Sequence, residues 1–422
     1  MMLIAAFVST VFLYSLISQR LERTVLTAPI VFTLAGIFVY GLPPEFTNLE
    51  LEREGYLLIA EVGLVMTLFT DAAHINFRSA TGNRRLPIRL LTTGMLLTIL
   101  LGALGAMVVF SGLTWWEAGI LAAILAPTDA GLGAVIVNSP RVPARIRQAL
   151  NIEAGLNDGL SVPFLMCFIA LALESSEGAA AVLTRFVGEQ IGYGTLVGAG
   201  IGLIGGWLLG LAGRKQWMAA PMQQLGLVAL PLLAVMASEA SSASMFIAAY
   251  VAGFAVQVGF ADAGRHGVEF TETWGQLFDF FVFFLFGLIV ARAWPQFDLS
   301  HVLYGLLSLT LVRMVPVALA LVGTGLSRAT VLFMGWFGPR GLASIVLGLV
   351  YLERQAHLPE EATIRLAVMM TVLLSIFAHG LSAVPGIRYY AKRIASLGSD
   401  VPEHQGGEIQ KYVAHKHQPR LQ

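Results

Sequence analysis

The chain has 422 residues, of which 56% are hydrophobic and only 12% are charged, and 26 basic residues balance 26 acidic ones. Soluble domains carry about 25% charged residues, so a surface this poor in charge would not stay dispersed in water. This composition excludes a soluble globular protein, an intrinsically disordered chain and a nucleic-acid binder that relies on basic excess. It indicates a protein that crosses a membrane many times.

Apolar segments long enough to cross the hydrocarbon core, which takes about 20 helical residues, recur along the chain. The first lacks a basic region before it and a small-residue cleavage site after it, so we interpret it as a span and not as a signal peptide. We predict 13 transmembrane helices at 2-18, 25-41, 56-73, 87-111, 115-137, 148-173, 190-213, 223-238, 244-260, 275-292, 302-323, 329-351 and 364-385. Residues 1-395 form the predicted transmembrane domain, and 396-422 form a polar cytoplasmic tail that we expect to be disordered.

The basic residues of the predicted loops set the orientation. Most of the 26 Lys and Arg residues fall in the loops after the odd-numbered spans and in the C-terminal tail. Because cytoplasmic loops are enriched in Lys and Arg, we predict an outside N-terminus and a cytoplasmic C-terminus. The expected location is a cell membrane, the inner membrane in a prokaryote.

Two predicted spans are interrupted in their middle. The fifth contains Ala-Pro-Thr-Asp at 126-129, and the twelfth contains Gly-Pro-Arg-Gly at 338-341. Proline frees a carbonyl one turn back, which a membrane protein tolerates only where the backbone lines a cavity or is buried in protein. The two spans occupy matching places in two six-span halves. The seventh span links the halves, so the second half is inverted relative to the first. Such paired interruptions are typical of a transporter's binding site.

Ionisable side chains within the spans are few, and each costs about 3 kcal/mol or more, so each needs a reason. They are Glu61, Asp71, Asp129, Glu153, Asp158, Glu239, Asp279, Arg313 and Arg340. The densest group surrounds the first interruption, in ILAPTDAGLG at 124-133 and NIEAGLNDGLSVPF at 151-164. We therefore place the candidate functional site at this interruption.

The side chains at this point are oxygen donors. Thr128 and Asp129 follow the break, while Asn157 and Asp158 lie on the sixth span. With freed main-chain carbonyls they suit an alkali or alkaline-earth cation and not a thiolate-seeking metal. A carboxylate can also hold a proton, so a cation and a proton that compete for Asp158 would be exchanged.

Structural roles are the alternative for several of these groups. Asp129 could cap the half-helix that follows the break, because a helix N-terminus favours negative charge. Glu153 is expected to neutralise the buried Arg313, and Arg340 to satisfy freed carbonyls or to compensate the helix-end dipoles.

Other ionisable groups have less defined predicted roles. Glu61 and Asp71 are candidates for a funnel or polar cavity. Asp279 and Glu239 are expected to line a funnel or cap a helix near the ends of their spans.

Several motifs together point to a known family. APTDAGLG followed by IEAGLNDG resembles the paired signature of NhaP-type sodium/proton antiporters, in the monovalent cation:proton antiporter-1 family. LVMTLFTDAA at 64-73, LVRMVPVALAL at 311-321 and FMGWFGPRGLASIVLG at 333-348 resemble the third, eleventh and twelfth spans of that family. The resemblance covers about residues 1 to 390. One departure is Ala154, where many members have a serine whose hydroxyl lies near the ion.

The resemblance implies an all-α membrane protein of 13 helices, in two inverted six-helix repeats with discontinuous helices. It also implies a homodimer in which a core domain moves against a dimerisation domain. The implied activity is secondary active exchange of Na⁺, or of Li⁺ or K⁺, for protons by alternating access. No cofactor is expected besides the transported ions, and no nucleic-acid partner.

The resemblance also assigns roles to residues. Asp158 would alternate between proton and cation, and Asp129, Thr128 and Asn157 would complete or order the site. The transported Na⁺ would be held by Asp158, Asp129 and Thr128. Electrogenic relatives have a second aspartate at the position of Asn157, so the exchange is predicted to be electroneutral, one cation for one proton. Glu153 and Arg313 would then form a structural ion pair beside the site.

Three other functions compete with this prediction. A K⁺/H⁺ antiporter would use the same fold and the same ligands. An intramembrane aspartyl protease also uses two buried aspartates, but its usual Gly-x-Gly-Asp element is absent here. A cation channel would need a filter of repeated carbonyl rings, and no such segment is present. We therefore predict a transporter and not an enzyme.

Overall fold

The computed structural model describes residues 2–21, 24–42, 53–74, 85–173, 187–241, 243–260, 268–353, 358–397 and 401–404. Regular structure in these residues is entirely helical. Each of the 13 predicted spans coincides with one helix or with one interrupted helix. Within the described part, eight helices are long and apolar enough to cross a membrane by length and composition, and α2, α7, α13 and α18 are shorter apolar helices. The residues after 404, and several basic residues used to predict the orientation, lie outside the described residues.

The helices in chain order are α1 (Met2–Leu21), α2 (Ala28–Tyr40), α4 (Arg53–His74), α5 (Arg85–Arg89), η2 (Leu90–Gly94), α6 (Met95–Val109), α7 (Trp115–Ile124), α8 (Ala130–Val137), α9 (Ala144–Leu173), η3 (Val187–Tyr193), α11 (Gly194–Arg214), α12 (Ala220–Glu239), α13 (Met245–Gly259), α14 (Val268–Ala293), η5 (Trp294–Gln296), α15 (Leu299–Leu309), α16 (Leu311–Ala320), α17 (Arg328–Trp336), α18 (Leu342–Glu353), α19 (Glu361–Ala395) and η6 (Pro402–His404).

Both predicted interruptions are present. The fifth span divides into α7 and α8, and the twelfth divides into α17 and α18. The eleventh span has a kink that was not predicted, where Thr310 separates α15 from α16 with φ −106° and ψ −91°. Two π-helical turns, η2 and η3, also precede α6 and α11 without a clear signal in the sequence.

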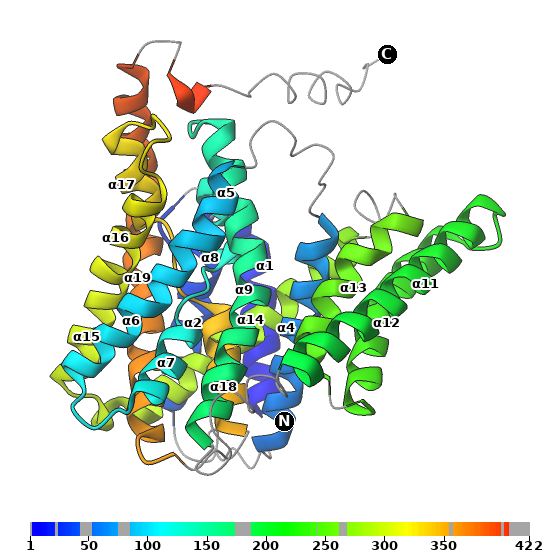
Figure 1. The fold of residues 1–422 in the computed structure, drawn as a ribbon, viewed down its shortest axis with the longest axis horizontal. Coiled ribbons are helices and arrows are strands. Elements are labelled where there is room, and N and C mark those ends of the chain that lie inside the picture. The colour runs from blue at the N-terminus through cyan, green and yellow to red at the C-terminus, as the bar shows by residue number, and fades with distance from the viewer. Residues whose placement is uncertain are drawn as a thin grey trace.

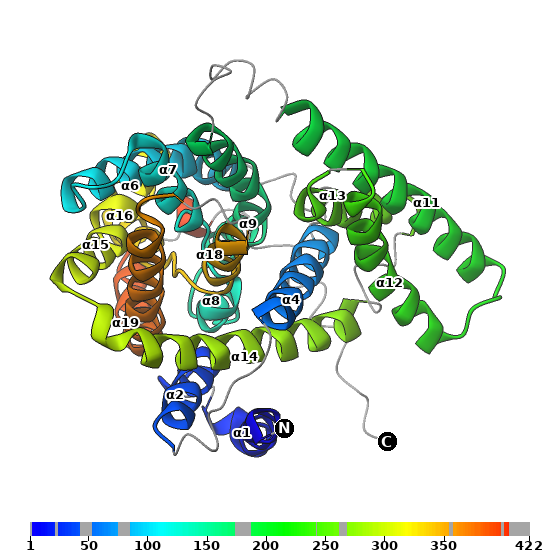
Figure 2. The same cartoon turned by 90° about the horizontal axis from the view of Figure 1, so that it is seen from below.

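The helices form two groups joined by α4 and α14. Figure 2 shows α6, α7, α8, α9, α15, α16, α18 and α19 gathered on one side and α11, α12 and α13 on the other. The helix α4 lies between the groups, α14 runs along one edge of the bundle, and α2 and α1 lie outside α14. The first group therefore contains both broken helices, which places the candidate site in its interior.

Glycines allow the closest helix contacts. In α11, glycines recur every fourth residue from Gly194 to Gly210 and are all buried. A Cβ atom at Gly198 or Gly202 would overlap a backbone carbonyl oxygen of α13. Gly36 of α2 and Gly287 of α14 allow a similar approach, because each lies against a carbonyl oxygen of the other helix. These crossings are tight because small residues let two backbones come together.

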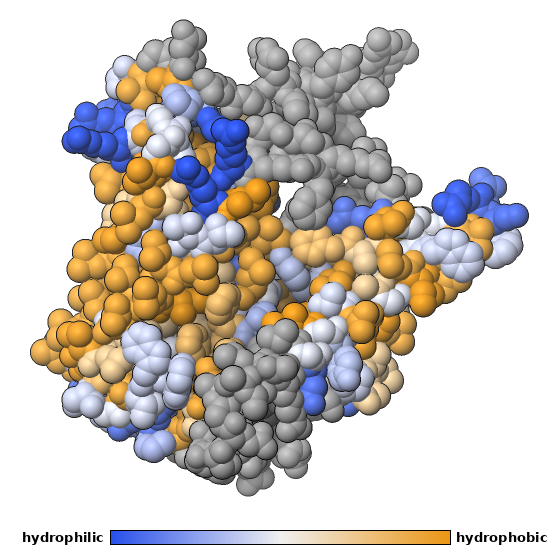
Figure 3. Space-filling view, in the orientation of Figure 1, coloured by the Kyte–Doolittle hydropathy of each residue, from blue (hydrophilic) through white to orange (hydrophobic). Residues whose placement is uncertain are grey.

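The outer surface suits a bilayer. Figure 3 shows a broad hydrophobic face over α6, α15, α16 and α17, with hydrophilic residues toward its two ends. The helix α1 exposes Phe12 and Leu16 at 62% and 65% of their surface. Exposed apolar surface of this extent is expected where the surroundings are lipid and not water.

The short helix η6 folds back onto the bundle. Glu403 is buried, and its Oε1 accepts hydrogen bonds from the Ser327 backbone N–H at 2.8 Å and from the Thr330 hydroxyl at 2.7 Å. The Arg145 guanidinium donates to the carbonyl oxygen of Pro402. Burial raises the pKa of Glu403, but the hydrogen bonds from Ser327 and Thr330 outweigh it and hold the pKa below its usual value. This turn connects the starts of α9 and α17.

Candidate cation-binding site

The two helix breaks lie against each other in the interior of the first helix group. The backbone N–H of Asp129 donates to the carbonyl oxygen of Pro339 at 2.8 Å, so one break is hydrogen-bonded to the other. Residues 121–129 and 337–345 are buried throughout. Four half-helix ends therefore meet away from water, and their backbone groups need partners there.

Asp129 caps two of these ends. Its Oδ1 accepts from the backbone N–H of Leu132 at 2.8 Å, in its own half-helix α8. Its Oδ2 accepts from the backbone N–H of Leu342 at 2.5 Å, in the first turn of α18. Gly341 permits this approach, because a Cβ atom there would overlap Asp129 Oδ2. Both carboxylate oxygens of Asp129 thus cap helix ends. Capping is the predicted alternative to a role of Asp129 as an ion ligand.

Arg340 satisfies the opposite end of the first break. Its side chain is fully buried, and Nη1 donates to the carbonyl oxygens of Ala126 at 2.8 Å and Pro127 at 3.0 Å. These carbonyls lie at the C-terminal end of α7, where the helix dipole favours a positive charge. The backbone N–H of Arg340 donates to Ser375 Oγ of α19 at 2.6 Å. Arg340 therefore donates to carbonyl oxygens freed by the first break, which is one of the two roles predicted for it.

Asn157 connects α9 to the break. Its Nδ2 donates to Thr128 Oγ1 at 2.7 Å, and both side chains are buried. Asn157 Oδ1 and Asp158 Oδ1 are also buried, and neither has a hydrogen-bond partner among the described residues. A buried polar atom without a partner is costly and is uncommon in folded proteins. These two oxygens are the strongest indication of a ligand at this position.

Glu153 and Arg313 form a buried salt bridge between α9 and α16. Arg313 Nη1 lies 2.6 Å from Glu153 Oε1, and each side chain is 3% exposed. Gly338 leaves room for the guanidinium, because a Cβ atom there would overlap it. The pair neutralises both charges one turn before Asn157, so the Arg313 charge is not left to neutralise Asp158.

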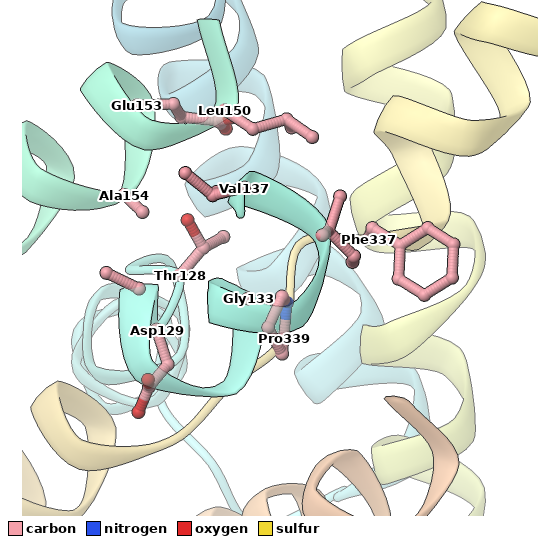
Figure 4. Close-up of a pocket in the computed structure, with 11 residues that line it drawn as sticks. Thr128, Asp129, Gly133, Val137, Leu150, Glu153, Ala154, Phe337 and Pro339 are labelled. Carbon is pink, nitrogen blue, oxygen red and sulfur yellow. The ribbon is translucent and has the colours of Figure 1, made fainter. Parts of the chain in front are cut away.

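A small cavity adjoins these groups. It has a volume of about 20 Å³, enough for one water molecule, and it is lined by Thr128, Glu153, Ala154 and residues of the two breaks. Figure 4 shows the Thr128 hydroxyl and the Asp129 carboxylate pointing to opposite sides of the break. Ala154 lines this space and contributes no oxygen to it.

Two further carboxylates lie near Asp158. Asp71 of α4 and Asp279 of α14 are close enough to interact with its charge, as is Asp129. The carboxyl group of Asp71 lies next to Gly155 on α9. Asp279 Oδ1 is buried and has no hydrogen-bond partner among the described residues. The structure therefore brings both carboxylates close to Asp158, Asp71 from the last turn of α4 and Asp279 from the middle of α14.

Tyr250 lies beside Asp158 on α9, whereas Glu61 lies further away. The Tyr250 ring of α13 packs on Gly159, and its hydroxyl donates to the Leu156 carbonyl oxygen at 3.5 Å. Nothing in the sequence singles out Tyr250, since an aromatic residue in an apolar helix is ordinary. Glu61 is half-buried on α4, nearly three turns before Asp71, which is about 15 Å along the helix. It is not among the charges that act on Asp158.

The carboxylates do not form a chelating cluster. Across the described ranges, no three His, Cys, Asp or Glu side chains are placed to hold a metal ion together. A cation at Asp158 would take its other ligands from the Asn157 amide, the Thr128 hydroxyl, backbone carbonyls and water. Such neutral oxygen ligands around one carboxylate fit a monovalent cation.

The family model described as "Sodium/hydrogen exchanger, transmembrane" matches residues 4–388, which is most of the chain. The chain belongs to the sodium/hydrogen exchanger family. The predicted family and the predicted cation/proton antiporter fold are thereby confirmed, and the protein is a multi-pass membrane protein.

Two curated relatives of this family member are antiporters. The K⁺/H⁺ antiporter NhaP of Alkalimonas amylolytica is 26% identical over 404 residues, which cover 93% of this chain and 66% of the relative. Na⁺/H⁺ antiporter 2 of Zygosaccharomyces rouxii is 24% identical over 284 residues, which cover 62% of this chain and 34% of the relative. The chain thus spans about two thirds of the first relative and about one third of the second.

Solved structures of an exchanger share the fold. The sodium proton antiporter MjNhaP1 from Methanocaldococcus jannaschii at pH 8 aligns with a TM-score of 0.71 and 20% identity, over 93% of this chain and all of the other. An electron-microscopy map of the same antiporter aligns with a TM-score of 0.69 and 19% identity, over 94% of this chain and 98% of the other. This likeness concerns the fold alone.

Proposed function

We propose that the protein is a secondary antiporter that exchanges a monovalent cation for a proton by alternating access. The observation that carries the proposal is the pair of buried, unpartnered oxygens on Asn157 and Asp158, beside two hydrogen-bonded helix breaks. Discontinuous helices that meet in the interior are how many transporters build their ion sites. Membership of the exchanger family supports the same activity.

Asp158 is the proposed exchanging group. The charges of Glu153 and Arg313 cancel in their salt bridge, and both Asp129 oxygens cap helices. Asp158 therefore binds either a proton or a cation, and both cannot occupy it together. This competition couples the two fluxes without a further device.

The proposed exchange is electroneutral, with one cation for one proton. Asn157 cannot carry a proton as a second aspartate would, and it holds the Thr128 hydroxyl instead. Na⁺ is the proposed substrate, with Li⁺ accepted. K⁺ is the alternative, because the curated NhaP relative is named a K⁺/H⁺ antiporter. The ligand set of hard oxygens serves either cation.

Location and assembly complete the proposal. The protein works as a homodimer in a cell membrane. The basic loops indicate that its N-terminus lies outside and its C-terminus lies in the cytoplasm.

An intramembrane aspartyl protease is disfavoured, because its two aspartates must share a proton. Both oxygens of Asp129 already accept backbone N–H bonds.

The test is cation-dependent proton exchange by the purified protein in proteoliposomes. Na⁺, Li⁺ or K⁺ added outside should dissipate an imposed pH gradient, and Asp158→Asn should abolish this. The control is Asp298→Asn, which makes the same change at an exposed position where Asn still caps α15. Full exchange by Asp158→Asn would overturn the site, and rates that depend on membrane potential would overturn electroneutrality.

A further inference from the structure

A groove between α17 and α19 is separate from the cation site. It has a volume of about 650 Å³, within the range of small-molecule sites, and aromatic rings form much of its wall. Leu332, Phe333 and Trp336 line it from α17, while Pro385 and Tyr389 line it from α19. Leu332 and Tyr389 are about 60% exposed, so the groove opens toward the surroundings of the protein.

The predicted thirteenth span places the groove across the edge of the hydrocarbon layer. α19 has 35 residues and is about 52 Å long, whereas the hydrocarbon core is about 30 Å thick. The predicted span ends at residue 385, in the middle of the groove wall. The apolar side chains therefore lie beside acyl chains, and Tyr389 and Arg393 lie at the level of lipid headgroups. Aromatic rings and arginines are typical of that level.

The headgroup end of the groove is basic. Arg393 lines the groove, and its Nε donates to the Tyr389 hydroxyl at 3.2 Å while the guanidinium lies over the Tyr389 ring. Arg328, Arg388 and Lys392 are exposed at the same end. Figure 3 shows hydrophilic residues at this upper end of the hydrophobic face, above α17. Basic pockets between membrane helices on the cytoplasmic side favour anionic lipid headgroups.

We propose that this groove is a binding site for one anionic phospholipid of the cytoplasmic leaflet. An acyl chain lies along Leu332, Phe333 and Trp336, and the phosphate lies at Arg393. The charge of the site selects the occupant, because a zwitterionic lipid would fill the apolar part equally well but would gain less from Arg393.

The groove shares a wall with the cation cavity. Phe337 lines both, and the tip of its ring packs on Gly386 of α19. The preceding residue, Trp336, donates through Nε1 to Ser382 Oγ at 2.9 Å. Its carbonyl oxygen accepts from His379 Nε2 at 2.9 Å. A lipid in the groove therefore contacts the end of α17 at the break itself, so its binding should affect the cation site.

Fluorescence quenching tests the binding directly and does not require exchange activity. The protein is reconstituted in phosphatidylcholine vesicles that contain rising fractions of phosphatidylglycerol brominated on its acyl chains. The difference between wild type and Trp336→Phe isolates the signal of Trp336. Half-maximal quenching should occur at about fivefold lower content of brominated phosphatidylglycerol than of brominated phosphatidylcholine, the preference expected from one arginine near a phosphate.

Matched variants make the test specific. Arg393→Gln should remove the fivefold preference, and Arg214→Gln, which changes an exposed arginine in the last turn of α11, should keep it. Ala329→Phe fills the groove and should reduce the quenching of Trp336, while Ala318→Phe makes the same change on the exposed face of α16 and should not. Equal quenching by both lipids in the wild type, or an unchanged preference in Arg393→Gln, would overturn the proposal. Inorganic phosphate in solution should not displace the lipid, and displacement would contradict a phospholipid site.

Discussion

Replacement of Asp129 by Asn distinguishes a capping role from an ion-ligand role. Asp129 accepts two buried backbone N–H bonds, from Leu132 and Leu342. An Asn side chain has one acceptor oxygen, so one of these N–H groups would face an NH₂ group instead. A hydrogen bond to a charged group is worth about 1.5–3 kcal/mol, and a buried N–H without a partner costs about 1–3 kcal/mol. We expect Asp129→Asn to lower the free energy of unfolding by about 2–3 kcal/mol.

Thermal unfolding of the purified protein, followed by tryptophan fluorescence, measures this loss. For a chain of 422 residues, the typical unfolding entropy converts 2–3 kcal/mol into a decrease of about 3 °C in Tm. Asp158→Asn is the matched comparison, because it removes the same charge where Oδ1 has no partner among the described residues. Neutralising a buried group without a partner relieves a cost, so its Tm should stay equal or rise. The two substitutions should thus act on stability in opposite directions.

A ligand role for Asp129 would give a different pair of results. Loss of a charged ligand would raise the KM for the cation and would leave the Tm equal or higher, as for Asp158→Asn. A higher KM together with an unchanged or increased Tm in Asp129→Asn would therefore refute the capping role. The capping role would be supported by a lower Tm together with a loss of exchange activity that is proportional to the loss of folded protein.

Three further outcomes follow from the contacts around the site and at the C-terminal turn. Arg313→Gln leaves Glu153 buried without its partner and should lower the free energy of unfolding by about 3–5 kcal/mol. The loss of folded protein is measured by size-exclusion chromatography. The double variant Glu153→Leu with Arg313→Met should restore folding, because neither charge is left unpaired. Asp279→Asn removes a carboxyl group that would attract the cation when ionised, and should raise KM several-fold with little change in kcat; an unchanged KM in the exchange assay would contradict this. The lowered pKa of Glu403 means that its stabilisation of η6 is complete above the unfolded pKa and is lost as pH falls through the folded pKa. Proteolysis after α19 should therefore increase in acid, and Glu403→Gln should remove that pH dependence.

The sequence was sufficient for the large features because each has a strong local signal. Hydrophobic length marks membrane helices, and Pro127 and Pro339 mark the two breaks. The pairing of Glu153 with Arg313 followed from the cost of an isolated arginine in a membrane, and the structure contains that contact.

The remaining features depend on contacts between distant segments. The bond from Leu342 to Asp129 joins residues 213 positions apart, and nothing local to either residue predicts it. Asp279 lies in the aromatic segment FDFFVFFLFG, and its proximity to Asp158 results from how α14 crosses the bundle. The kink at Thr310 and the π-helical turns also lack a local signal in the sequence. Tertiary packing determines these features, and one sequence does not contain that information in a readable form.

The distribution of buried charge supports the proposal that one carboxylate, Asp158, carries the exchange. Arg313 is neutralised by Glu153, and Arg340 faces the carbonyl end of α7 while Asp129 faces the N–H ends of α8 and α18. Each of these charges is matched by an opposite charge or by helix dipoles, so none needs a mobile ion. Asp158 has no such partner among the described residues and has the charges of other aspartates nearby. In the proposed exchange, a cation beside Asp158 offsets the cost of burying its charge, and a proton replaces the cation when the cation leaves. This replacement makes the two ions substitutes for each other, which is the physical condition for coupled exchange.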